Sequence, residues 1–162
     1  MANDYFEKCF QLAEKSPCKK MKFGSVIILD KKIIGQGYNH PVHKCVEYLC
    51  NPCIRESEDI SSGTRVELCS AVHAEQDAIF DARLGINDLS SSRLYIAGFY
   101  ADGEKFIKQE KGFYCSFCSR IIARVGINDI RILTTKGEES LNIEELLASS
   151  YEYALGRKRI KK

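Results

Sequence analysis

The sequence predicts an α/β protein, and the order of its expected strands and helices supports that prediction. Runs rich in β-branched residues alternate with stretches whose apolar residues recur at helical spacing. Two stretches of helical spacing end in the same way, over residues 83–88 and 124–129: Arg, an aliphatic residue, Gly, Ile, Asn and Asp. Glycine there suits the left-handed residue that ends a helix. A length of 162 residues suits one domain, which we take as 1–162.

The first half of the chain predicts a helix, a hairpin and a long connection. The helix has Asp4 as its N-cap and is ended by Pro17. Residues 25–29 and 33–36 are rich in β-branched side chains and predict an antiparallel hairpin. Residues 39–70 lack periodicity and carry four cysteines. A connection of that length in a compact domain indicates a function or a metal that braces it.

The second half predicts two strand–helix pairings and a closing helix. One helix begins near His73 and the other near Cys115, and strands are expected at 93–97 and 130–133. A charged excursion occupies 99–113, and a last helix is expected at 143–151. Right-handed crossovers would place the two middle helices side by side and parallel. Their N-terminal ends would then meet at one edge of the sheet.

Charge and cysteine content narrow the function classes. Lys and Arg number 24 against 22 Asp and Glu, so the net charge is +2, and a dedicated nucleic-acid binder is not expected. We expect the basic tail, 156–162, to be a flexible, solvated terminus. The sequence shows no signal peptide and no apolar run of ~18 residues, so we expect a cytoplasmic protein without a membrane partner. Its eight cysteines are then expected to be reduced, as metal ligands or core thiols.

The two helix starts carry a pattern typical of catalytic zinc. His73, Cys115 and Cys118 offer one imidazole and two thiolates, and three protein ligands leave a fourth tetrahedral position open. Zinc in such a site lowers the pKa of a bound water toward neutrality. Glu75 follows His73 by two residues, close to the metal but not needed as a ligand. We therefore expect Glu75 to be the catalytic acid and base.

These motifs resemble a known family. Residues 69–79, Cys-Ser-Ala-Val-His-Ala-Glu-Gln-Asp-Ala-Ile, together with the later Cys-Ser-Phe-Cys, resemble the zinc segments of deoxycytidylate deaminases in the cytidine deaminase superfamily. Stretches 22–27, 35–39, 62–65 and 67–69 extend the resemblance over roughly residues 5–135. Two positions depart from the family's pattern: Tyr114 replaces the usual Pro, and Asp77 replaces the Asn common in nucleotide deaminases.

The resemblance implies a three-layer α/β/α sandwich around a five-stranded mixed sheet. It also implies a Zn²⁺ cofactor, hydrolytic removal of an exocyclic amine from a small-molecule nucleotide, and a homo-oligomer. It assigns substrate contacts to Asn39 and Ala74. From the residues alone, Asn39 after a strand is also an ordinary turn residue.

A second group of cysteines precedes the zinc helix. The spacing of Cys50 and Cys53 is that of a zinc knuckle, and a second, structural zinc is expected within the set Cys45, Cys50, Cys53 and Cys69. The alternative is a set of reduced thiols without a metal. Cys9 and Cys18 are expected to be such thiols.

Three functions remain in competition. The first is deamination of a cytosine nucleotide, with dCMP converted to dUMP and ammonia. The second is the same chemistry on free cytosine, guanine, CMP or adenosine in RNA. The third is a non-catalytic RNA-binding zinc ribbon, whose closed site would use Cys50, Cys53, Cys115 and Cys118 and give His73 no role. Cations available for a nucleotide phosphate are Lys19, Lys20, Lys22, Arg55 and Arg65.

Overall fold

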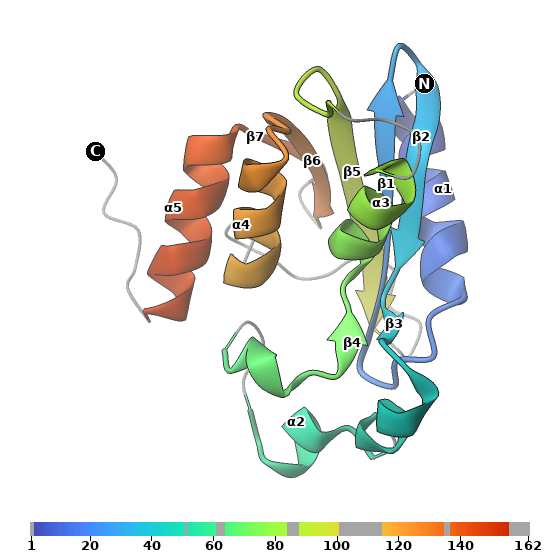
Figure 1. Cartoon of the computed structure of the whole chain (residues 1–162), viewed down its shortest axis with the longest axis vertical. Helices are drawn as coiled ribbons and strands as arrows, with labels where there is room; N and C mark the ends of the chain where they lie inside the picture. The colour runs from blue at the N-terminus through green and yellow to red at the C-terminus, as the bar shows by residue number, and fades with distance from the viewer. Residues whose placement is uncertain are drawn as a thin grey trace.

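Five strands form the central sheet of the computed structural model, which describes residues 2–50, 52–60, 64–83, 88–100, 115–134 and 137–155 (Figure 1). The strands lie in the order β2-β1-β5-β6-β7. Only β5 and β6 run parallel, and the other neighbours are antiparallel, so the sheet is mixed. The bounds are Met21–Leu29 for β1, Lys32–Tyr38 for β2, Arg93–Tyr100 for β5, Asp129–Thr134 for β6 and Gly137–Leu141 for β7.

Helices cover both faces of this sheet. Helix α1, Ala2–Glu14, packs on β1 and β5, where Phe6, Cys9 and Leu12 meet one set of strand residues that includes Val26 and Tyr95. The intervening strand residues enter a second core, which lies under α3 (Ala74–Arg83), α4 (Ser116–Arg124) and α5 (Ile143–Ala154). Alternation along the strands explains how one sheet serves two cores. The predicted three-layer α/β/α sandwich is confirmed.

Glycines let the helices approach the sheet closely. A Cβ added to Gly37 of β2 would lie 2.6 Å from the carbonyl oxygen of Ala74, and nearer still to the backbone nitrogen of Ala78. Gly24 of β1 meets α1 in the same way, with an added Cβ 2.9 Å from the backbone nitrogen of Ala13. Gly37 therefore fixes where the first turn of α3 rests on the sheet.

Differences from the sequence-based expectation concern mostly the ends of elements. Strand β7 was not expected from the sequence, because four of its five residues, Gly-Glu-Glu-Ser-Leu, are not hydrophobic. In the structure its exposed positions alternate with partly or fully buried ones. Helix α1 begins at Ala2, so Asp4 lies in its first turn and is not its N-cap. Gly126 follows α4 with a φ of +84°, as its place in the repeated pattern predicted. Most of the charged excursion and the basic tail lie outside the described residues.

The long connection between β2 and α3 extends beyond one end of the sheet (Figure 1). It begins at β3 (His40–Pro41), which pairs with β4 (Ala71–Val72) at the end of the connection. Between them lie three short helices: η1 (Lys44–Leu49), α2 (Ile54–Ser57) and η2 (Val66–Leu68). In the parts of the chain that the structure describes, no helix is long and apolar enough to cross a bilayer.

Candidate metal centre and catalytic residue

Three side chains from two helix starts converge, as the crossover argument anticipated. His73 immediately precedes α3 and its carbonyl accepts the Asp77 N–H at 2.9 Å, while Cys115 is the N-cap of α4. The imidazole Nδ1 of His73 lies 3.3 Å from the sulfur of Cys115 and 3.2 Å from that of Cys118. All three candidate ligand atoms lie within 4.8 Å of one another.

Local hydrogen bonds hold both helix starts. The side-chain oxygen of Gln76 accepts the His73 N–H at 3.1 Å, which is half of a capping box. The Cys118 N–H donates to the Cys115 sulfur at 3.4 Å, so a candidate metal-ligating atom is also the cap of α4. Gln76 was not among the predicted site residues, although its position three residues after His73 is the capping-box spacing.

The electrostatics of the group favour a bound cation. The hydrogen bond from the Cys118 side chain, joined by His73, lowers the pKa of Cys115 to about 4 against the effect of burial. Burial raises the pKa of Cys118 well above its usual value. Burial alone would lower the pKa of His73, but its hydrogen bonds with Cys115 and Cys69 raise it well above the usual value. In the metal-free chain, the Cys115 thiolate is thus stabilised by hydrogen bonds from Cys118 and His73. A bound cation could stabilise the same thiolate in their place.

The donor set and its spacing fit zinc. With zinc bonds of about 2.3 Å to sulfur and 2.0–2.1 Å to nitrogen, tetrahedral geometry places a nitrogen about 3.5 Å from each sulfur. The two nitrogen–sulfur distances, 3.3 and 3.2 Å, lie close to that value. Three protein ligands leave a fourth position for a water or a substrate atom, which is typical of catalytic zinc sites.

Glu75 lies beside this group in the first turn of α3. Its side chain is buried, and its Oε2 accepts a hydrogen bond from the Cys118 thiol at 3.6 Å. Burial raises the pKa of Glu75, and the charge of nearby His73 opposes that rise. A carboxyl group with a raised pKa exchanges protons more readily near neutral pH, as an acid–base catalyst must.

The expected substrate contacts, Asn39 and Ala74, occupy different settings. Asn39 is 8% exposed; its Oδ1 accepts the Phe23 N–H at 2.7 Å and its Nδ2 donates to the Met21 carbonyl at 2.9 Å. The amide therefore fastens the loop after β2 to strand β1 and keeps one N–H for another partner. Ala74 is buried as the first residue of α3.

Asp77, the departure from the family's pattern, has a structural role here. Its Oδ2 accepts the Tyr38 N–H at 3.1 Å, and its Oδ1 lies 3.5 Å from the Nε2 of His40. The Tyr38 and His40 rings also pack together, with centroids 5.1 Å apart. Asp77 thus ties α3 to the end of β2, next to Asn39.

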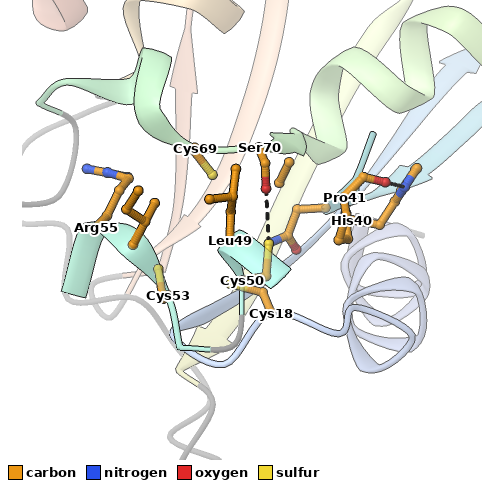
Figure 2. Close-up of a pocket in the computed structure, with 12 residues that line it drawn as sticks. Cys18, His40, Pro41, Leu49, Cys50, Cys53, Arg55, Cys69 and Ser70 are labelled. Carbon is orange, nitrogen blue, oxygen red and sulfur yellow. Dashed lines mark hydrogen bonds between the residues drawn. The ribbon is translucent and has the colours of Figure 1, made fainter. Parts of the chain in front are cut away.

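Three cysteines of the second group lie together, and a fourth cysteine joins them. Cys50, Cys53 and Cys69 line one cavity, and Cys18, which was expected to be an idle thiol, lines it with them (Figure 2). The side chain of Cys45 lies outside the described part of the structure. The zinc-ribbon arrangement is not the one observed, because Cys115 and Cys118 meet His73 and not Cys50 and Cys53.

Comparisons with known proteins identify the family of this chain. Residues 1–134 match the family described as the cytidine and deoxycytidylate deaminase zinc-binding region. A deoxycytidylate deaminase of Mycobacterium phage D29 is 31% identical over 126 residues, which cover 73% of this chain and 82% of the phage protein. One of Schizosaccharomyces pombe is 24% identical over 153 residues, or 94% of this chain. The match spans only 41% of the length of that yeast protein.

Solved structures support the fold. The apo dCMP deaminase of cyanophage S-TIM5 has a TM-score of 0.53 at 18% identity, covering 82% of this chain and 81% of its own. Cytidine deaminase of Mycobacterium tuberculosis has a TM-score of 0.52 at 14% identity, covering 93% and 96%. With the family match over most of the chain, the assignment is direct: the chain belongs to the cytidine and deoxycytidylate deaminase family.

Proposed function

We propose that the chain catalyses the hydrolytic deamination of a cytosine nucleotide, converting dCMP and water to dUMP and ammonia. The observation that carries the proposal is a buried carboxyl group, Glu75, directly beside a His73, Cys115 and Cys118 ligand set. The names of the yeast and phage relatives supply the substrate class. Free cytosine, guanine, CMP and adenosine in RNA are the competing substrates for the same chemistry.

In this proposal Glu75 moves the protons. A zinc ion held by the three ligands would supply the electrophile that makes a water molecule acidic enough to react at neutral pH. Glu75 takes a proton from the attacking water and delivers it to N3 of the pyrimidine as the C4–O bond forms. It then takes the remaining proton from the new C4 hydroxyl and delivers it to the exocyclic amine, so the C4–N bond breaks, the C4 carbonyl forms and ammonia leaves. Burial of Glu75 keeps bulk water from competing for these protons.

Recognition of a nucleotide requires a cation for the phosphate, because an unpaired dianion is costly to desolvate. Arg65 lies 3.8 Å from Glu67 with both side chains more than half exposed, so it can exchange that partner for a phosphate. Arg55 already donates to the Thr64 carbonyl at 2.8 Å. The nucleotide is therefore expected to exceed its nucleoside at least tenfold in kcat/KM, about 1.4 kcal/mol.

Ammonia release measured on a panel of substrates tests the proposal. The panel contains cytosine, cytidine, CMP, dCMP, dCTP, guanine and an RNA containing adenosine, and Glu75→Gln serves as the inactive control. Preferential turnover of dCMP supports the assignment. Equal rates on cytidine and its monophosphates, or turnover of guanine or RNA alone, refute the nucleotide substrate and leave the deaminase chemistry standing.

Two further parts of the proposal concern assembly and location. Phe80 of α3 and Phe117 of α4 are 60% and 41% exposed, and large exposed aromatic side chains favour a second copy of the chain as a partner. Light scattering of the purified protein is expected to give a multiple of the 18.4 kDa chain mass. Every cysteine whose side chain the structure describes is a free thiol, which suits the reducing cytoplasm.

A further inference from the structure

Asn39 lies beside the candidate metal centre, although it is far from the ligand residues in sequence. The short strands β3 and β4 pair antiparallel, with His40 opposite Val72 (Figure 1). Extending this register by one residue places Asn39 opposite His73, one of the three candidate ligands. Residues directly opposite in an antiparallel pair lie close together. A molecule bound at the metal centre would therefore come near Asn39.

Hydrogen bonds fix both the backbone and the side-chain amide of Asn39. Its backbone N–H donates to the Phe23 carbonyl at 3.2 Å, and its amide bonds to the backbone of Phe23 and Met21. Its own carbonyl accepts the hydroxyl of Ser16 at 2.6 Å. A primary amide carries two N–H donors, and among the described residues the Met21 carbonyl is the partner of one. The second N–H of this buried amide can serve a molecule from outside the chain.

Ser16 is the contact between Asn39 and the end of α1. It is 2% exposed, and its backbone N–H donates to the Ala13 carbonyl at 3.0 Å. Its Oγ also accepts the Cys18 N–H at 3.2 Å. With its proton given to Asn39 and a lone pair given to Cys18, the hydroxyl has one defined orientation. Ser16 therefore holds the Asn39 carbonyl in a fixed direction.

We propose that Ser16 is a positioning residue, which orients Asn39 so that the second N–H of its amide donates to the substrate. The inference rests on the proposed function, because the acceptor is a substrate bound at the metal centre. An amide N–H requires an acceptor such as a sugar oxygen or the pyrimidine carbonyl of a nucleotide. Loss of the Ser16 hydroxyl lets the Asn39 backbone turn, and the amide turns with it.

This role affects substrate binding and not the chemical step. Asn39 is neither a candidate metal ligand nor the acid–base group, so its contact with the substrate is the same before and during the reaction. Removal of such a contact raises KM and leaves kcat unchanged. A change that disturbed the metal ligands or Glu75 would instead lower kcat.

Steady-state kinetics of the full chain on dCMP test the inference, at a temperature where thermal denaturation shows every variant to be folded. Ser16→Ala should raise KM about three- to tenfold, the factor that corresponds to the net strength of one hydrogen bond, with kcat changed less than about twofold. Ser16→Thr keeps the hydroxyl and should restore KM.

Ser92→Ala is the matched control. Ser92 is also 2% exposed, and its hydroxyl also donates to a backbone carbonyl at 2.6 Å, that of Leu89. It precedes the start of β5, which pairs with the end of β1 opposite to the one that holds Asn39. Ser92→Ala should therefore keep the wild-type KM.

A double-mutant cycle shows whether Ser16 acts through Asn39. In an Asn39→Ala background, Ser16→Ala should change KM no further, whereas an independent structural role would add the same effect in both backgrounds. Wild-type KM in Ser16→Ala, an equal rise in Ser92→Ala, or additive effects in the cycle would each overturn the inference. Should Asn39→Ala fail to fold, the comparison of Ser16→Ala with Ser92→Ala decides.

Failure of the proposed function is seen in a different measurement. Wild-type protein would then not turn over dCMP in the substrate panel. The same variants are in that case compared on the panel substrate that wild-type protein does deaminate, and unchanged KM in Ser16→Ala on that substrate overturns the positioning role.

Discussion

Replacing Gly37 with alanine should damage catalysis without touching a catalytic residue. The added Cβ would lie 2.6 Å from the Ala74 carbonyl oxygen, whereas ordinary van der Waals contact begins at 3.4 Å. Because the contact is to backbone, the first turn of α3 must retreat by about 0.8 Å. That turn carries Glu75 and follows His73 directly. Displacement of a catalytic group by about 1 Å costs on the order of 100-fold in rate, equivalent to about 2.7 kcal/mol.

Gly24→Ala provides the control for general damage. Its Cβ meets the backbone of Cys9 and Ala13 in α1, on the opposite face of the sheet. Overpacking should cost either variant about 1–3 kcal/mol of stability. At a temperature where thermal denaturation shows both to be folded, only Gly37→Ala should lose kcat/KM on dCMP. Wild-type kcat/KM in Gly37→Ala, or an equal loss in Gly24→Ala, would refute the role of this contact.

Three further predictions use the site and one surface network. Glu75→Ala should keep the catalytic zinc and lose activity by at least 10²–10⁴-fold, since Glu75 is not a ligand; loss of one zinc ion per chain would show that it is. Cys115→Ala and Cys118→Ala should each lose that zinc and all activity, because two remaining ligands bind it weakly; normal zinc and rates in either variant would contradict the site. Although burial acts in the opposite direction, hydrogen bonds from Arg131 and Arg93 hold the pKa of Asp129 below its usual range. The stability that this adds is present above the unfolded-state pKa of about 3.9 and disappears as the pH falls below it. Asp129→Asn should thus lower the free energy of unfolding by about 0.5–1 kcal/mol at pH 7 and leave it unchanged near pH 2, as measured by urea denaturation; an equal loss at both pH values would exclude this charge effect.

The sequence predicted the elements that have a strong local signature. Runs of β-branched residues predict the β1–β2 hairpin and strand β6. His73 and Cys115 mark the two helix starts. Strand β7 was not predicted because its residues are mostly polar. Its antiparallel pairing with β6, and not its own composition, makes it a strand. Propensity in strands depends on such context.

Contacts between distant segments were the harder part. Nothing near Cys18 in sequence indicates that its thiol faces Cys50 and Cys53, because that meeting depends on where a long aperiodic connection folds. The anchoring role of Asp77 and the backbone bonds of Asn39 likewise require the position of β1 relative to β2. Spacing can specify a ligand set on two helices, but it cannot specify the path of a loop.

The hydrogen bond between Cys69 and the imidazole of His73 connects the two cysteine-lined regions. The Nδ1 of His73 faces Cys115 and Cys118, which leaves Nε2 as the atom that can meet Cys69. A contact that holds Cys69 in place therefore also helps to fix the orientation of the His73 ring, as the partners of metal-bound histidines do. The connection between β2 and α3 would thus help to orient the imidazole that the proposed zinc ion binds.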